Sequence, residues 1–235
     1  ASGVTHRRNA RPEGPASSAL LAAGRSALPG DGRREHNGGT PMKNRWSGEE
    51  AARVVEQYGP RWGEALALRT YVSRLLGSEP ALVLHGGGNA SVKAPWRTVT
   101  GDQPAAICVK ASGFDMAAIE PAGHPALDLA ALLRLQRLDA LDDEAMTNEV
   151  RRALFDARGP NPSIETLVHA FLPAAFIDHT HADAILTLTN QRDGLAMVQE
   201  AYWDSAAVIP YVEPGFALAK AVAAAAASKP SARAI

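Results

Sequence analysis

The sequence predicts one three-layer α/β/α domain, in which helices cover both faces of a mixed, mainly antiparallel sheet. Length and composition suit one soluble globular domain, because the chain has 235 residues, of which 46% are hydrophobic and 21% are charged. Short apolar runs typical of strands are mixed with amphipathic runs typical of helices. Their spacing lacks the regular strand-helix-strand repeat of a parallel sheet, so we expect mainly antiparallel strands.

Residues 1–41 differ in composition from the rest of the chain. They are rich in Ala, Gly, Ser, Pro and Arg, hold six arginines against three acidic residues, and show no sustained hydrophobic period. Such a segment buries too little apolar surface to offset its ordering entropy, which predicts a disordered tail. The apolar run at 19–23 is too short for a signal sequence. A further interpretation is that the native protein begins at Met42 and that the preceding residues are not part of it.

Residues 42–235, which we expect to form the domain, have a composition that argues against several kinds of partner. This part is acidic overall and has no basic stripe, so nucleic acid is not expected to bind. Its longest apolar run, 221–227, is far shorter than the roughly 20 residues that cross a bilayer, so no membrane partner is expected. The single cysteine, Cys108, lies in an apolar run and is predicted to be a buried thiol. These features favour a reducing, cytoplasmic location.

Two helices are predicted to open the domain. The first is expected over 47–58, with Ser47 and Glu50 at the spacing of a capping box and Gly59-Pro60 as its end. The second is expected over 61–76, because its leucines and alanines recur at helical spacing.

Two short apolar strands follow, and each leads into a loop of small residues. The strand expected over 81–84 continues into a loop over 85–93 that contains three consecutive glycines. The strand expected over 106–109 continues into a loop over 110–113. Glycines leave no side chain above the backbone, so loop amides can approach a ligand closely and form an anion-binding nest. Taken together, the two loops predict one phosphate pocket, although each alone is compatible with an ordinary turn.

The remaining elements are helices around a strand that carries two histidines. Further helices are predicted over 126–138, 143–157, 163–171, 182–190, 193–203 and 214–228, and a further strand over 207–209. In the strand expected over 175–180, His179 and His181 should point to the same side and could converge on one divalent metal. Catalytic zinc usually takes three protein ligands, so a further donor is required. Histidines that face the core or a partner are the alternative.

The order of these features resembles the class II aldolase/adducin family over about residues 47–220. The motifs that carry the resemblance are the glycine loop with Asn89, the Ser112-Gly113 turn, the Ser163-x-Glu165 segment and the His179-x-His181 pair. Within the family, the two glycine-bearing loops are most similar to those of the aldolase part of bifunctional rhamnulose-1-phosphate aldolase/dehydrogenases.

The resemblance implies a zinc-dependent aldolase that cleaves a ketose 1-phosphate, such as rhamnulose 1-phosphate, to dihydroxyacetone phosphate and an aldehyde. It implies that Glu165 is the catalytic acid/base and that His179 and His181 bind Zn²⁺ or another divalent metal. It assigns the phosphate of the sugar substrate to Gly88, Asn89, Ser112, Gly113 and Ser163. It also implies a homo-oligomer, which is commonly a tetramer in the family.

Several alternatives stay open. The family uses the same framework in sugar-phosphate 4-epimerases, and its adducin branch is a non-catalytic scaffolding module. The family's third zinc ligand lies in a later His-Gly segment, whereas no histidine follows His181 here. We therefore expect either a fragment with an incomplete metal site and fold or a divergent member without the third ligand, and weak cleavage by the isolated chain. His169, one helical turn after Glu165, is predicted to be a supporting partner rather than a ligand.

Overall fold

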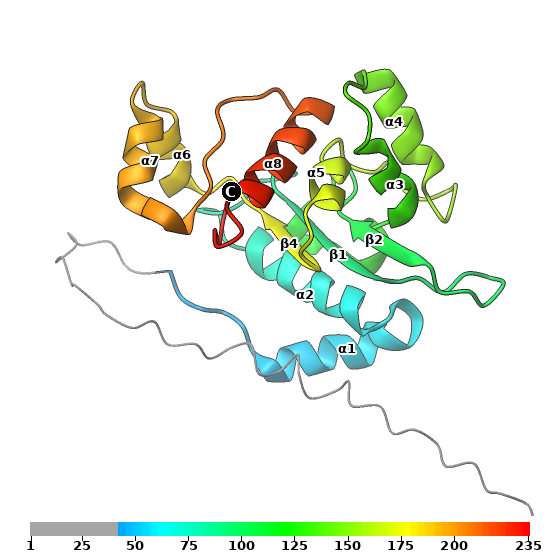
Figure 1. The fold of residues 1–235 in the computed structure, drawn as a ribbon. Coiled ribbons are helices and arrows are strands. Elements are labelled where there is room, and N and C mark those ends of the chain that lie inside the picture. Colours follow the sequence, from blue (N-terminus) through cyan, green and yellow to red (C-terminus); the bar gives the residue numbers. More distant parts are fainter. Residues whose placement is uncertain (1–41) are drawn as a thin grey trace, which may run out of the picture. The chain divides into compact units, whose positions relative to one another are not determined.

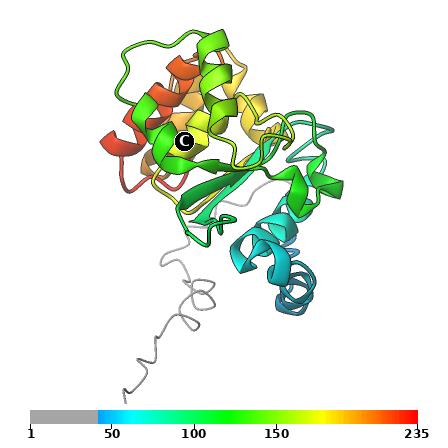
Figure 2. The same cartoon turned by 90° about the vertical axis from the view of Figure 1, so that its right-hand side faces the viewer.

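The structure is a computed structural model that describes residues 42–235, so the predicted disordered tail over 1–41 lies outside the described residues. Residues Asn44–Ile235 form one unit around a four-stranded sheet in the order β3-β2-β1-β4, and every strand pair is antiparallel. The strands are β1 (Asn89–Pro95), β2 (Ala105–Val109), β3 (Ala126–Asp128) and β4 (Phe176–His179). Helices lie on both sides of the sheet, which confirms the predicted α/β fold (Figures 1 and 2).

The two faces of the sheet carry different helices, because neighbouring strand residues point to opposite sides. Ile107 and Val109 of β2 belong to a core with four helices on one face. These helices are α3 (Leu129–Leu135), α4 (Asp143–Arg152), α5 (Thr166–Phe171) and α8 (Phe216–Ser228). Cys108, between the two, packs with Leu66 on the opposite face, which α1 (Gly48–Trp62) and α2 (Glu64–Gly77) cover (Figure 1). The predicted burial of Cys108 is confirmed, and burial raises the pKa of its thiol to about 12.

The first helix begins where the sequence predicts but ends later. The Ser47 hydroxyl accepts a hydrogen bond from the Glu50 amide at 3.3 Å and so caps α1. The predicted end at Gly59-Pro60 is wrong, because α1 continues through Pro60 to Trp62. Pro60 removes one backbone donor, but the helix continues past it, and Trp62 in the last turn packs against the core cluster that contains Leu66. The actual break is Gly63, whose φ of 82° is a conformation that favours glycine.

The strand predicted over 81–84 is wrong. Its backbone carbonyls at Ala81 and Leu82 accept hydrogen bonds from the amides of Asp183 and His181, at 3.0 and 2.9 Å, without forming a regular ladder. The first strand begins instead at Asn89, inside the segment predicted to be loop. β1 forms because its backbone groups find partners on both sides, in β2 and in β4, whereas residues 81–84 make only scattered backbone hydrogen bonds.

The helix predicted over 126–138 is divided into β3 and α3. Asp128 ends the strand and caps the helix, since its carboxylate accepts the Ala131 amide at 3.1 Å. The helix predicted over 143–157 stops at Arg152, because the chain that follows bonds to β3 through the Phe155 amide and the Ala153 carbonyl. Both differences arise because tertiary hydrogen bonds outweigh local helix propensity.

The last quarter of the chain is helical as predicted, with one exception. The helices expected there are confirmed as α6 (Asp183–Thr189), α7 (Gly194–Tyr202) and α8. The strand expected over 207–209 is wrong, since this part of the chain has only an isolated parallel bridge between Ala206 and Ala234. Across residues 42–235, no helix is both long and apolar enough for a membrane span.

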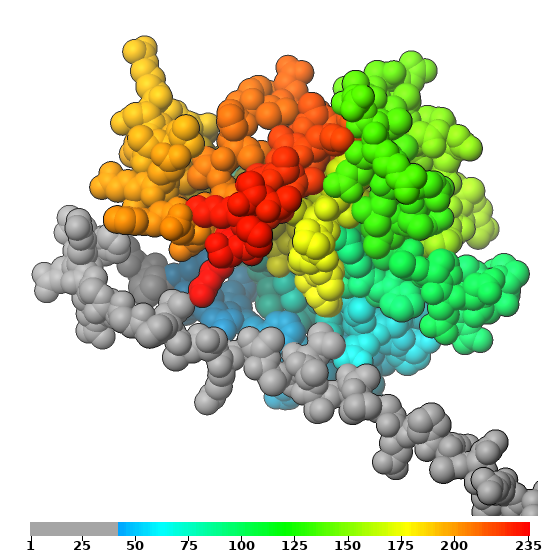
Figure 3. All heavy atoms as spheres, viewed as in Figure 1, coloured from blue at the N-terminus to red at the C-terminus, as the bar shows by residue number. Residues whose placement is uncertain are grey.

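Helix α8 packs against α5, the short helix that follows the candidate catalytic residue Glu165. Phe171 of α5 meets Phe216 of α8 edge to face, with ring centroids 6.3 Å apart. In the space-filling view, the yellow α5–β4 segment lies between red α8 and green α3 and α4 (Figure 3). This packing fixes α5 above the sheet and therefore fixes the residues that α5 presents to β1.

Candidate functional site

One face of β1 carries three polar residues that bond to α5 and its flanking chain. Asn89 Nδ2 donates to Glu165 Oε2 at 3.0 Å, and Ser91 Oγ is hydrogen-bonded to His169 Nδ1 at 2.8 Å. Lys93 Nζ donates to two backbone carbonyls that follow α5. These side chains share one face because alternate strand residues point the same way. The strand therefore anchors both Glu165 and His169.

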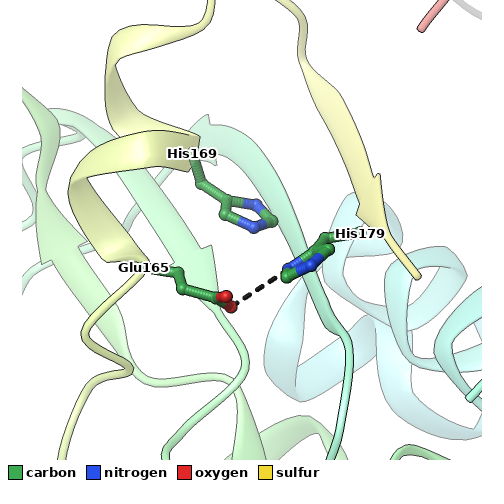
Figure 4. A group of neighbouring side chains, drawn as sticks. All are labelled: Glu165, His169 and His179. Carbon is green, nitrogen blue, oxygen red and sulfur yellow. Dashed lines mark hydrogen bonds and ion pairs between the residues drawn. The ribbon is translucent and has the colours of Figure 1, made fainter. Parts of the chain in front are cut away.

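Glu165, His169 and His179 form a compact cluster (Figure 4). Each offers a ligand atom, and these atoms all lie within 4.8 Å of one another. Glu165 and His169 come from successive turns at α5, whereas His179 ends β4 and is hydrogen-bonded through Nδ1 to Glu165 Oε2 at 3.1 Å. Imidazole nitrogens and a carboxylate oxygen are ligands that suit zinc and similar divalent metals.

His179 and His181 lie side by side, with ring centroids 4.9 Å apart. The strand expected over 175–180 ends at His179, so His181 follows the strand rather than belonging to it. The backbone amide of His181 bonds to Leu82, and a Cβ placed on Gly87 would lie 3.3 Å from its Nδ1. The glycine loop thus leaves room for the His181 ring beside His179.

Glu165 is held ionised by its neighbours. Burial by itself would raise its pKa, but the hydrogen bonds and charges of His179, the Asn89 amide and His169 outweigh burial and lower the pKa to about 2. Burial, reinforced by the nearby charge of His179, lowers the pKa of His169 to about 3 despite the opposing charge of Glu165. His169 is therefore neutral at physiological pH, and within residues 42–235 only its Nδ1 is engaged in a protein hydrogen bond.

The two loops predicted to hold phosphate converge. A Cβ on Gly86 would lie 3.8 Å from Gly113 Cα, and Lys110 Nζ donates to the Gly86 carbonyl at 3.1 Å. The Ser112 amide donates to the Asn161 carbonyl at 2.9 Å, which fixes the second loop beside Ser163. The glycine loop, the loop over 110–113 and the segment that leads to Ser163 therefore meet next to Glu165.

The five predicted phosphate-binding residues divide into two groups. Ser112 and Ser163 line one cavity, and Gly113 adjoins Ser112. Gly88 and Asn89 lie instead with the Glu165 cluster. Gly88 has a φ of 65°, and a Cβ there would lie 2.9 Å from the His179 carbonyl, so this glycine permits close approach of β4. Asn89 is 1% exposed and bonds to Glu165.

Ser91 is a site residue that the sequence pattern did not single out. Its hydroxyl contacts His169, and it lies two residues after Asn89 on the same strand face. Recognition of β1 as a strand would have pointed to Ser91, because the spacing of two residues is the strand period. The sequence predicts His169 to be a supporting partner rather than a metal ligand. It is hydrogen-bonded to Ser91, and it also lies within the cluster of Glu165 and His179 that could hold a metal.

Comparison with known proteins gives consistent results. Residues 68–235 match the model of the class II aldolase and adducin N-terminal domain. A Bacillus subtilis (strain 168) protein named uncharacterized oxidoreductase YuxG is 35% identical over 191 residues, which are 81% of this chain but 27% of that protein. The solved N-terminal class II aldolase domain of a conserved Thermoplasma acidophilum protein has a TM-score of 0.68 at 35% identity, covering 78% of this chain and 80% of that one. The chain therefore belongs to the class II aldolase and adducin family.

Proposed function

We propose that this domain is a zinc-dependent aldolase that cleaves a ketose 1-phosphate resembling rhamnulose 1-phosphate to dihydroxyacetone phosphate and an aldehyde. The observation that carries the proposal is the cluster of Glu165, His169 and His179 beside the converging glycine loops. Family membership supports aldolase or epimerase chemistry. The rhamnulose-type substrate rests on the similarity of the two glycine-bearing loops to those of bifunctional rhamnulose-1-phosphate aldolase/dehydrogenases.

The donor atoms of Glu165, His169 and His179 lie within 4.8 Å of one another, which fits a divalent metal ion. His179 and His181, whose rings are adjacent, are the proposed ligands, and Glu165 and His169 are further donors beside His179. His169 fits this role because it is neutral and Ser91 engages only one of its ring nitrogens. A cation bound there would supply a Lewis acid to the ketose carbonyl.

Glu165 is the proposed proton carrier. Its lowered pKa makes it a carboxylate before the reaction, which is the form that accepts a proton. Asn89 and His179 both bond to Oε2, so they orient the carboxylate. Glu165 would accept the proton of the hydroxyl on the carbon that becomes the aldehyde as the carbon–carbon bond breaks. It would then return this proton to the carbon next to the carbonyl, where cleavage leaves the electron pair.

The phosphate would bind away from the bond that breaks. Ser163 lies two residues before Glu165, so a phosphate held at Ser163 fixes the distance between the anchored end of the substrate and the proton carrier. Binding energy gained at the phosphate then positions the reacting carbons.

Product analysis by NMR tests the proposal against its alternatives. The 235-residue chain is incubated with excess zinc and rhamnulose 1-phosphate, and in parallel with ribulose 5-phosphate. We expect dihydroxyacetone phosphate and an aldehyde from the first substrate and no epimer from the second. An epimerised pentulose phosphate would instead favour the 4-epimerase, and unchanged substrates with no bound metal would favour the scaffolding module.

A further inference from the structure

An open cavity of about 270 Å³ lies between α4 and the segments that hold Ser112 and Ser163. One wall is a single face of α4, since its lining residues are spaced by three and four positions: Met146, Thr147, Val150 and Arg151. The other wall consists of Ser112 and residues 161–164. The α4 wall thus combines the core residues Met146 and Val150 with the cation Arg151, and the other wall carries the hydroxyls of Ser112 and Ser163.

Arg151 is the cation that lines this cavity. Within residues 42–235 it makes no ion pair with a carboxylate, whereas the adjacent Arg152 pairs with Glu149 at 2.8 Å. A guanidinium without a carboxylate partner on a cavity wall can accept an anionic ligand without breaking an existing ion pair. Arg152 does not line the cavity. The two arginines therefore differ both in their position relative to the cavity and in whether they form an ion pair.

Two hydroxyls on the opposite wall can also donate to an anion. The Ser112 amide is already used by the Asn161 carbonyl, but the Ser112 hydroxyl has no partner in the described part of the chain. The Ser163 hydroxyl accepts a bond from the Glu165 amide at 3.2 Å and keeps its own hydrogen for donation. The cavity therefore offers one positive charge and two hydroxyl donors, and no carboxylate lines it.

We propose that Arg151 binds the phosphate of the substrate together with the hydroxyls of Ser112 and Ser163, and that it selects phosphorylated sugars over free sugars. This inference rests on the proposed function, because it concerns the phosphate end of the same substrate. A guanidinium can bind phosphate through two parallel N–H bonds, which are stronger and more directional than those of hydroxyls alone. Arg151 thereby supplies the charge that the motif residues Ser112, Gly113 and Ser163 lack.

Binding of inorganic phosphate to the 235-residue chain tests this role without requiring cleavage. Isothermal titration calorimetry should show one phosphate per chain. Arg151→Gln should weaken binding by about tenfold or more, because a hydrogen bond to a charged group is lost. Arg151→Lys should retain part of the affinity, since it keeps the charge but not the two-bond geometry. The matched control, Arg152→Gln on the same turn of α4, should stay within about twofold, as exposed ion pairs contribute little.

Several results would overturn the assignment. They are the absence of phosphate binding by the wild-type chain, equal affinities of the wild-type chain and Arg151→Gln, and an equal loss in Arg152→Gln. Circular dichroism of each variant shows that it is folded. Dependence of phosphate binding on Arg151 in a chain that cleaves no sugar phosphate would support this anion subsite while contradicting the proposed aldolase function, so the two failures are distinguishable.

Discussion

Asn89 Nδ2 donates a hydrogen bond to Glu165 Oε2 over 3.0 Å, and the same carboxylate oxygen lies 3.1 Å from His179 Nδ1. Asn89 is almost fully buried, so water does not compete effectively for this bond. The family resemblance assigns Asn89 to the substrate phosphate, whereas this contact makes it a support for the proposed proton carrier. The two roles predict different kinetics.

Asn89→Leu should lower kcat about a hundredfold and leave KM within about threefold, because a misplaced catalytic group affects the chemical step. The Michaelis constants are measured from initial rates of dihydroxyacetone phosphate release at saturating zinc. Ser112→Ala is the comparison variant and should mainly raise KM. A raised KM with unchanged kcat in Asn89→Leu would instead assign Asn89 to phosphate binding.

Gly88→Ala should destabilise the domain more than Gly101→Ala does. Both glycines have positive φ, 65° and 90°, so both substitutions carry backbone strain. Only at Gly88 would the new Cβ meet the His179 carbonyl, at 2.9 Å, whereas nothing lies within 4 Å at Gly101. The difference in free energy of unfolding, measured in urea, should be about 1–3 kcal/mol. Equal losses would show that β4 can move away from Gly88 at no cost.

Asp178→Asn should destabilise the domain more than Arg69→Met does. The Arg69 side chain is fully buried between α2 and the sheet and pairs with Asp178 at 2.5 Å, while the Asp178 side chain is 45% exposed. Loss of the carboxylate leaves the buried guanidinium without a counter-charge, which costs about 3 kcal/mol or more. Loss of the guanidinium leaves a carboxylate that water can reach, so we expect about 1 kcal/mol.

Urea unfolding of both variants checks this order. The control is Arg53→Met, which removes an exposed ion pair with Glu50 and should change stability by less than about 0.5 kcal/mol. The reverse order, with Arg69→Met the more damaging, would mean that the packing of the Arg69 side chain matters more than its charge.

The sequence predicts the helices better than the strands. Helices form through interactions between residues close in sequence, whereas strands need partners that are distant in sequence. The capping residue Ser47 and the alanine-rich run of α8, a composition with high helix propensity, are local signals. β1 is defined by partners far away in sequence, since Ser91 pairs with Val109 on one side and with Ile177 on the other. The run at 81–84 looks like a strand, but within residues 42–235 it makes only two long-range backbone bonds, to His181 and Asp183, and no regular ladder, which no local pattern reveals.

The candidate site shows the same division. Motif order leads to Glu165, His179 and His181, and the structure places His179 between the other two, bonded to Glu165 and with its ring beside that of His181. The contact between Ser91 and His169 depends on the register of β1 beneath α5, and the place of Arg151 depends on how α4 packs. Neither relationship leaves a periodic pattern, so neither can be derived without the tertiary structure.

His124 should make the stability of the domain depend on pH. It is buried beside the Ser73 hydroxyl, and burial, with the charge of Arg69, lowers its pKa from 6.5 to about 3. Between these values the unfolded chain binds a proton that the folded chain does not bind, so stability falls as the pH decreases below about 6.5. His124→Gln removes this contribution.

The wild-type chain should lose about 2 kcal/mol more than His124→Gln between pH 7 and pH 5, because one proton contributes about 1.4 kcal/mol per pH unit. Urea unfolding at a series of pH values measures both proteins. His169 contributes equally to the two curves and cancels in the difference. Parallel curves would show that His124 titrates normally in the folded protein.

The most direct test of the proposed site is the zinc dependence of dihydroxyacetone phosphate release from rhamnulose 1-phosphate, compared between the wild-type chain and Glu165→Gln. Because weak cleavage is expected, a sensitive coupled assay is run at excess zinc, and bound zinc is measured in both proteins. We predict slow release by the wild-type chain that requires zinc and is abolished by Glu165→Gln, with zinc still bound to the variant. Release that continues unchanged in Glu165→Gln, or none from the zinc-loaded wild-type chain, would contradict the account.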